Sequence, residues 1–297
     1  MHEVALIVDC GRDIGRLRPL WQHVPERFRM WFVATGEAVL GEAGSAVREL
    51  TAHTDRVRTV AMFDRGRGWA ESVGTAVRGM VSVLGRLGVR VVVTYGATAG
   101  AVAAAFAAKL LAIPHLHILR GDEDRSFCNT NLAAVLASKT VGGPRFVCKK
   151  PAQKTASYTL CLLDPFNTLK FKRLYETTRD VLAEQEGEKV LICAERDNLA
   201  LRPLKRLPNL VHKKAVSYEE LLSSLEEARI FVTNTEVAFL EAKACGIEVI
   251  FVDEWGRRVI AGGDRGSVGV VWDGVEEVWR VLASFKLGVE RRGLRRG

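Results

Sequence analysis

Amide side chains are scarce in this sequence of 297 residues, which contains six Asn and three Gln. That scarcity, beside abundant Arg, Glu and Val, is typical of proteins from hot environments. Six cysteines are present, but no two of them form a C-x-x-C pair and no secretory signal precedes them. A disulfide framework is therefore not predicted, and the cysteines are interpreted as small core residues in a reduced compartment.

Long uncharged runs are also scarce, and only the segment 91–108 needs a membrane test, because it contains no charged residue. Tyr, Gly and Thr interrupt its first half and Ala fills its second half, so a buried strand, a tight turn and a buried helix are predicted there. The first apolar run, VALIV, has acidic residues on both sides and is predicted to be a strand instead of a signal peptide. We expect a cytoplasmic protein without a membrane span.

Charge is abundant but unevenly spread. Hydrophobic residues make up 48% and charged residues 26% of the chain, a balance that excludes disorder and predicts folded domains. The net charge of +8 favours anionic partners, and half of it comes from the last twelve residues, so residues 291–297 are interpreted as a basic tail. Basic pairs elsewhere are scattered without interleaved aromatic residues, and we therefore expect no nucleic-acid partner.

The order of predicted elements indicates an α/β protein of two Rossmann-like domains. Short β-branched runs alternate with helical stretches, which is typical of parallel sheets with crossover helices. Apolar periodicity stops in VCKKPAQKTAS, so a linker is predicted near 149–157, between an N-terminal domain (1–150) and a C-terminal nucleotide-binding domain (157–290). The predicted strands are 4–9, 29–34, 57–63, 89–95, 115–119, 159–164, 189–194, 209–213, 229–234, 248–253 and 268–272.

An internal echo supports this symmetry. The segments 91–118 and 230–252 both read as a strand ending in V-T, a tight turn, an alanine-rich helix and a second strand. Open parallel sheets bind ligands at the carboxyl ends of their strands. The turns 94–98 and 233–237 are therefore expected to face a cleft between two parallel sheets.

The start of the chain and its second V-T turn carry a family resemblance. In DCGRDIGRLRPL, Asp13, Arg16, Pro19 and Leu20 fall on the Glu, Lys, Pro and Leu of the element G-T-R-P-E-x-I-K-x-x-P-L. The stretch VTNTEVAFLEAKACGIEV fits T-D-S-G-G-x-Q-E-E-A-x-x-x-G-x-P-V without gaps, with Glu241 in register. In both elements the chain resembles UDP-N-acetylglucosamine 2-epimerases, as a divergent and shortened member with the glycosyltransferase B fold.

The resemblance implies a UDP-sugar or related nucleotide-sugar ligand, with Glu241 on the ribose hydroxyls of UDP. Arg12 and Arg16 follow the first predicted strand, where helix N-terminal amides and guanidinium groups suit a phosphate. An exposed basic turn is the alternative interpretation. The candidate nucleotide-binding residues are Arg12, Asp13, Arg16, Thr233, Thr235, Glu241, Arg257 and Arg258.

Glu236 stands where the family has a glycine beside the UDP phosphates. Its carboxylate would repel them, because two unit charges about 4 Å apart interact by about 4 kcal/mol at an effective dielectric near 20. Thr233 and Glu236 also fit the S/T-x-x-E capping box, which is a structural role. Both interpretations stay open.

The acid and base positions of the family are largely replaced. Ala97 stands where the family has Asp in its G-D-T turn, and Leu119 stands where it has Glu in H-x-E-A-G. Asn129 and Asn131 lie in the segment that replaces P-E-E-x-N-R, and Asp164 occupies the histidine of H-R-x-E-N. Proton transfer at a sugar carbon needs carboxylates or histidine, so the usual epimerase chemistry is not predicted.

Four residues are candidate catalytic groups, each with a structural alternative. Asp122 and Glu123 follow the strand 115–119 and could supply a carboxylate, although acidic runs are commonly solvated loops. Asp164 ends a strand and could instead cap the next helix. His117 could instead satisfy a buried hydrogen bond. His115 and His117 lack an obvious third ligand, so neither a metal nor another cofactor is expected.

Three functions stay open on the sequence alone. The first is a nucleotide-sugar enzyme related to the epimerases with altered chemistry, and the second is a glycosyltransferase that uses a nucleotide-sugar donor. The third is a non-catalytic relative that binds a ligand or a partner. A homodimer is a further expectation.

The missing proton carriers generate a prediction for UDP-N-acetylglucosamine. We expect no C2 epimerisation at a rate typical of the family, because Ala97 and Leu119 have no proton to exchange. Incubation in deuterium oxide followed by proton NMR measures the reaction directly. Deuterium at C2 of the sugar would contradict the prediction.

Overall fold

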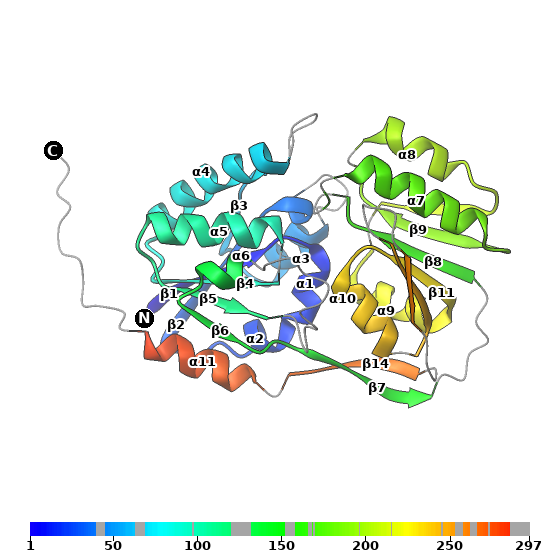
Figure 1. The fold of residues 1–297 in the computed structure, drawn as a ribbon. Coiled ribbons are helices and arrows are strands. Elements are labelled where there is room, and N and C mark those ends of the chain that lie inside the picture. Colours follow the sequence, from blue (N-terminus) through cyan, green and yellow to red (C-terminus); the bar gives the residue numbers. More distant parts are fainter. Residues whose placement is uncertain are drawn as a thin grey trace.

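Two lobes, each built on a six-stranded sheet, make up the computed structural model of this chain (Figure 1). The structure describes residues 1–39, 45–62, 69–96, 98–119, 132–151, 158–165, 168, 170–195, 197–214, 216–244, 246–252, 258–261, 266–272 and 274–285. In β7, in β14, in β13 apart from Ile260, and at a few helix positions, including Glu236, the description covers the backbone alone.

The first sheet has the strand order β3-β2-β1-β4-β5-β6, and all its neighbours pair in parallel. The chain adds β2 and β3 on one side of β1 and then crosses to the other side for β4. The ends of β1 and β4 therefore flank the point where the strand order reverses. The strands are β1 (His2–Val8), β2 (Phe28–Ala34), β3 (Val57–Thr59), β4 (Val91–Tyr95), β5 (His115–Ile118) and β6 (Lys139–Val141).

Helices cover both faces of this sheet, as the alternating side chains of its buried strands require. One face packs against α1, α2 and α3, with Ile14, Leu20 and Leu50 in its core. The other face packs against α4 and α5, where Met80 and Leu84 lie on alanines of α5. The helices are α1 (Gly11–Arg16), α2 (Arg18–Gln22), the 3-10 helix η1 (Gly36–Val39), α3 (Ser45–His53), α4 (Trp69–Leu87), α5 (Ala99–Leu110) and α6 (Leu132–Leu136).

The second sheet repeats this plan in the order β10-β9-β8-β11-β12-β13. Its pairs are parallel except for β12 with β13, which is antiparallel. The strand order reverses between β8 and β11, as it does between β1 and β4. The strands are β8 (Tyr158–Leu163), β9 (Lys189–Cys193), β10 (Leu210–Lys213), β11 (Ala228–Thr233), β12 (Glu248–Val252) and β13 (Arg258–Ala261).

The second sheet is also covered on both faces. One face packs on α9 and α10, with Leu221 and Phe239 beside Phe231 of the sheet. The other face packs on α7 and α8 through buried apolar side chains such as Leu174 and Leu182. The helices are α7 (Phe171–Ala183), α8 (Asn198–Lys205), α9 (Tyr218–Glu227) and α10 (Glu236–Ala244).

The chain passes between the lobes along a two-stranded ribbon. The strand β7 (Arg145–Pro151) leaves the first lobe and pairs in antiparallel fashion with β14 (Gly266–Val271), which returns to it. The last described helix, α11 (Val275–Ser284), then lies on the first lobe near β1 and β2 (Figure 1). Its side chains Val278, Trp279 and Leu282 belong to the same core as those of β1 and β2.

This architecture confirms the predicted α/β class and the predicted pair of Rossmann-like domains. The 11 predicted strands are all present, whereas β6, β7 and β13 were not predicted. The segment 91–108 forms the buried strand β4 and the helix α5, and no described helix is long and apolar enough to cross a membrane. The domain limits at 150 and 157 stay a prediction, and so does the basic tail 291–297, which lies outside the described residues.

The helix α11 generates a stability prediction. Trp279 is 6% exposed, and its ring centroid lies 5.3 Å from that of Phe28 in β2. We expect Trp279→Ala to reduce the free energy of unfolding by about 3–5 kcal/mol, because it removes a large buried side chain. Urea unfolding measures the change, with the exposed neighbour Arg280→Ala as the control. Equal midpoints for the two variants would show that α11 is not part of the core.

Candidate functional site

The carboxyl ends of the two sheets bring charged side chains together between the lobes. Asp9 and α1 follow β1, and Asp164 follows β8, so one of the two strands at each reversal of strand order is followed by a carboxylate. Asp164 lies close enough to Asp9 and Arg12 for its charge to act on both. We call the following residues the interdomain cluster: Asp9, Arg12, Asp13, Arg16, Glu37, Asp164 and Glu241, which are all buried.

The strongest contact of the cluster joins the two lobes. Arg16 of α1 donates from Nε and Nη2 to the two carboxylate oxygens of Glu241 in α10, each at 2.7 Å. The Tyr218 hydroxyl of α9 also donates to Glu241 Oε1, at 2.8 Å. Burial disfavours the charged form of Arg16, but the carboxylates of Glu241 and Asp13 outweigh it and raise the Arg16 pKa. The guanidinium is therefore charged at every accessible pH.

The helix α1, which carries Arg16, lies in close contact with α9, which carries Tyr218. A side chain at Gly15 would place a Cβ atom 2.5 Å from Tyr218 Cδ1, so only glycine permits this approach of α1 to α9. The Arg16 guanidinium lies 5.2 Å from the centre of the Tyr218 ring and also donates to Asp13 Oδ1 at 3.0 Å. A cation close to an aromatic ring and bound to two carboxylates is held in one orientation.

A second arginine of α1 is paired within the first lobe. Arg12 donates from both terminal nitrogens to the two oxygens of Glu37 in η1, each at 3.3 Å. Burial raises the Glu37 pKa, and the Arg12 charge opposes this shift. The sequence predicts a phosphate-binding role for Arg12 and Arg16, and the structure pairs each of them with a carboxylate.

Asp9 is the least satisfied member of the cluster. Its carboxylate is 3% exposed and has no regular hydrogen-bond partner among the described residues. Gly36, with φ of +56°, and Gly100 leave room for it, because a Cβ atom at either position would lie within 2.6 Å of Asp9 Oδ1. Burial and the Asp164 charge raise the Asp9 pKa to about 7, although the Gly100 amide and the Thr98 hydroxyl oppose this.

The end of β8 is tied to the end of β11. The Asn234 side chain accepts from the Asp164 amide at 2.8 Å and donates to the Asp164 carbonyl at 2.9 Å. Thr233 Oγ1 accepts from the Thr235 amide at 3.1 Å. These bonds fix the predicted nucleotide-binding turn 233–235 beside Asp164. The nucleotide-binding roles of Thr233 and Thr235 stay a prediction.

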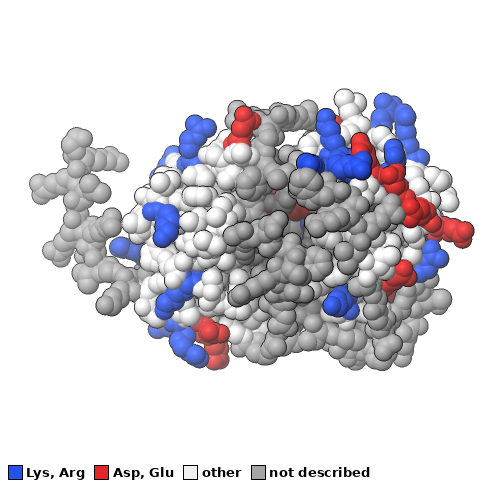
Figure 2. Space-filling view, in the orientation of Figure 1, with Lys and Arg blue, Asp and Glu red and all other residues white. Residues whose placement is uncertain are grey.

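Acidic groups outnumber basic ones in the interdomain cluster. It holds five carboxyl groups and two guanidinium groups, and both guanidinium groups already bond to carboxylates. The surface differs: Figure 2 shows Lys and Arg next to Asp and Glu over both lobes, without one continuous patch of either sign among the coloured residues. The net positive charge of the chain is therefore not repeated in the described part of this site.

His117 lies in the core of the first lobe. Thr94 Oγ1 is 2.8 Å from His117 Nδ1 and 2.6 Å from His115 Nε2, and both imidazoles are buried. Burial lowers the His115 pKa to about 4, so this ring is neutral at physiological pH. Within the described residues no group of three His, Cys, Asp or Glu side chains could hold a metal ion. The catalytic role of His117 stays a prediction.

Several predicted site residues lie outside the described part of the chain. Asp122, Glu123 and Arg257 are among them, and so is Ala97. Only the backbone of Arg258, at the start of β13, is described. The predicted roles of these residues stay predictions.

Sequence reasoning missed Asp9, Glu37 and Tyr218 as members of the site. Asp9 is the last residue of the predicted strand 4–9, and Glu37 follows the next predicted strand, so their positions at strand ends were the available signal. Nothing in the sequence around Tyr218 distinguishes it from a core aromatic residue, and its contact with Glu241 depends on tertiary structure.

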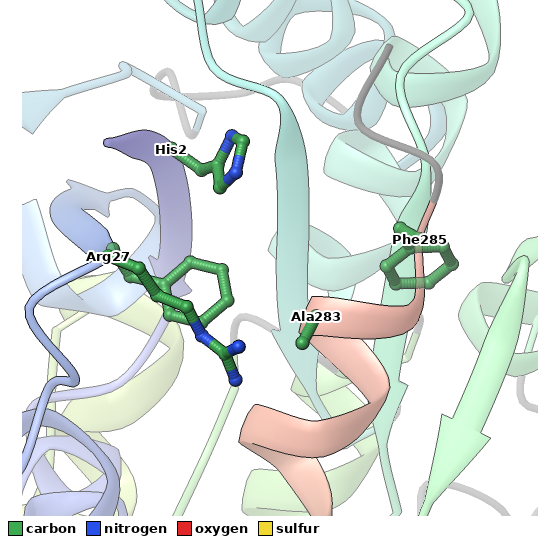
Figure 3. A pocket seen from close by; sticks show the side chains of 5 residues that line it. His2, Arg27, Ala283 and Phe285 are labelled. Carbon is green, nitrogen blue, oxygen red and sulfur yellow. The ribbon is translucent and has the colours of Figure 1, made fainter.

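A separate pocket lies at the opposite edge of the first sheet. His2 and Phe28 stand at the start of β1 and β2, and they line a cavity of about 210 Å³ with Arg27, Ala283 and Phe285 (Figure 3). The carboxyl ends of these strands carry the interdomain cluster. The pocket is therefore a full strand length away from the candidate site.

Comparison with solved structures identifies the fold. The UDP-GlcNAc 2-epimerase of Methanocaldococcus jannaschii, in complex with UDP-GlcNAc and UDP, is 14% identical with a TM-score of 0.65, over 95% of this chain and 99% of that chain. S. aureus MnaA with UDP is 12% identical with a TM-score of 0.61, over 96% and 89% of the two chains.

A third structure, UDP-GlcNAc 2-epimerase from Neisseria meningitidis bound to UDP-GlcNAc, is 12% identical with a TM-score of 0.59, over 86% and 84% of the two chains. No protein-family model matches this chain, and no curated protein matches it. At such identities the likeness shows the fold, and the predicted glycosyltransferase B-like arrangement is confirmed.

The buried carboxyl group of Asp9 generates a prediction on pH. Because its pKa rises from the ordinary value of 3.8 to about 7, the folded protein loses stability as pH rises from 4 to 7 and then levels off. Asp9→Asn removes this loss. Relative to the wild type, the free energy of unfolding of the variant should therefore increase by up to about 4 kcal/mol between pH 4 and pH 8.

Chemical unfolding at a series of pH values measures this difference. Asp180→Asn is the matched control, since Asp180 is an exposed residue of α7. A difference between Asp9→Asn and wild type that stays constant from pH 4 to pH 8 would contradict the raised pKa.

Proposed function

We propose that this protein binds a UDP-sugar, or a related nucleotide sugar, between its two Rossmann-like domains. The observation that carries the proposal is the position of Glu241. This residue is buried in α10, the helix that follows β11 at the reversal of strand order in the second sheet. Ligands of open α/β sheets bind at such positions. The three structures with this fold that are described above contain UDP or UDP-GlcNAc.

The contacts of Glu241 support a role at the ribose. An ionised carboxylate has about four acceptor positions, and Arg16 and Tyr218 use three of them here. One ribose hydroxyl can take the remaining position, and a second can replace the Tyr218 hydroxyl. The two hydrogen bonds from Arg16 orient the carboxylate for both bonds.

The chemistry proposed for this site differs from that of the epimerases. Leu119 follows β5 and cannot carry a proton, and Asp164 stands in place of a histidine. We therefore propose a UDP-sugar-binding protein related to the 2-epimerases in which the usual acid and base residues are largely replaced. A glycosyltransferase and a non-catalytic binding protein are the alternatives, and turnover with an acceptor would separate them.

The ribose role of Glu241 can be tested by calorimetric titration with UDP and with 2′,3′-dideoxy-UDP. In the wild type, loss of the hydroxyls should weaken binding by roughly tenfold to 150-fold, because hydrogen bonds to a charged group contribute about 1.5–3 kcal/mol. Glu241→Ala should bind both nucleotides with the weak affinity of the dideoxy compound.

Tyr218→Phe is the matched control, since it keeps the ring beside Gly15 and removes only the hydroxyl. Its affinity for UDP should equal or exceed that of the wild type. Glu241→Ala that still distinguishes UDP from its dideoxy form would refute the ribose role. A wild type that binds no nucleotide would refute the proposed function.

A further inference from the structure

We propose that Asp9 is the proton-accepting residue of the nucleotide site, so that binding of a nucleoside diphosphate takes up one proton at the Asp9 carboxylate. The inference rests on the proposed function and adds to it the residue that adjusts the charge of the site. The proton comes from solvent and bonds to one carboxylate oxygen, and nothing is oxidised or reduced.

Asp9 occupies the centre of the carboxyl edge of the first sheet. It follows β1, which lies between β2 and β4, and its Oδ1 lies between Gly36 after β2 and Gly100 in the first turn of α5. This is the reversal of strand order where α/β proteins bind ligands. The carboxylate is 3% exposed and has no ion-pair partner within the described ranges; the groups that approach it on α5, the Gly100 amide and the Thr98 hydroxyl, are neutral and form no hydrogen bond of regular geometry with it.

The charged groups that face Asp9 are mostly acidic. Asp164 comes from the end of β8 and Asp13 from α1, and both raise the cost of ionising Asp9. The η1 helix contributes Glu37, which is paired with Arg12 of α1. On α5 the facing groups are neutral, namely the Gly100 amide and the Thr98 hydroxyl.

Because both arginines are paired, their contacts determine which carboxyl group can change its protonation state when a nucleotide binds. A nucleoside diphosphate adds negative charge next to this cluster, and the guanidinium groups of Arg12 and Arg16 are already bonded to carboxylates. Asp13 and Glu241 form ion pairs with Arg16, and Glu37 forms one with Arg12. Asp9 has no such cation within the described ranges, so protonation of this carboxyl removes negative charge without breaking an ion pair.

A protonated Asp9 also gains a function that the carboxylate lacks. A carboxylate only accepts hydrogen bonds, whereas a carboxylic acid can donate one to a phosphate oxygen. Because the Asp9 pKa is about 7, protonation of this carboxylate costs little free energy at physiological pH. The site therefore binds the nucleotide more tightly at neutral and mildly acidic pH than at alkaline pH.

Calorimetric titration with UDP from pH 6 to pH 9 tests the inference. If only the protonated site binds, the dissociation constant should be about tenfold larger at pH 8 and about a hundredfold larger at pH 9 than at pH 6. Titration at pH 8 in HEPES and in Tris, which have different ionisation enthalpies, should show an uptake of close to one proton for each UDP bound.

Two variants identify the group that takes up the proton. Asp9→Asn should bind UDP at pH 9 nearly as tightly as the wild type does at pH 6, without proton uptake. Asp164→Asn removes a charge that raises the Asp9 pKa, so the loss of affinity should begin at a lower pH. Asp180→Asn, on the exposed surface of α7, should keep the wild-type pH profile. The ionisation of UDP itself is the same in every titration.

The outcomes separate this inference from the proposed function. A wild-type affinity for UDP that does not change from pH 6 to pH 9, or an Asp9→Asn profile equal to that of the wild type, overturns the inference and leaves nucleotide binding established. A pH profile of Asp164→Asn that equals the wild-type profile overturns the role of the second carboxylate. If Asp9→Asn does not fold, this same result for Asp164→Asn overturns the inference about Asp9. Absence of UDP binding at every pH overturns both proposals.

Discussion

The buried ion pair between Arg16 and Glu241 is the contact on which the arrangement of the two domains depends. Each partner comes from a different lobe; without Arg16 the buried Glu241 carboxylate would keep the Tyr218 hydroxyl but lose its counter-ion, and without Glu241 the buried Arg16 would keep the carboxylate of Asp13. Removing one partner of a buried pair leaves the other charge uncompensated, at a cost of about 3–5 kcal/mol. The contact of Gly15 with Tyr218 then brings α1 and α9 close enough for the pair to form. Backbone packing and electrostatics therefore specify the same relative position of the domains.

That ion pair has a consequence for the rest of the site. Because Arg16 and Arg12 neutralise protein carboxylates, the arginines that should attract a phosphate are already occupied. The protein as a whole carries a net charge of +8, while the described part of the site has more acidic than basic groups. Global charge therefore predicts poorly what a buried site prefers, since local pairing and desolvation determine it.

The sequence predicted most of the fold and only part of the site. Strand runs such as 91–95 are β-branched and bounded by turns, so local composition suffices to identify them. The three strands that were missed lie where this signal is weak: β6 has three residues, β13 is an antiparallel edge strand of the second sheet, and β7 pairs in antiparallel fashion with β14 in a separate two-stranded ribbon. Arg16 and Glu241 were both candidates, but their contact spans 225 positions and no local pattern reveals it. Asp9 was missed because its raised pKa comes from burial and from Asp164, and both depend on tertiary structure.

The ribbon of β7 and β14 has a mechanical consequence. The chain crosses between the lobes once in each of these strands, and the two crossings are hydrogen-bonded to each other along their length (Figure 1). Two crossings at separate places would restrain rotation of one lobe relative to the other. Because these two crossings lie side by side, they act as a single hinge, and rotation about it stretches neither strand. Opening the domain interface thus requires breaking the contacts around α1, while the connection between the lobes stays intact.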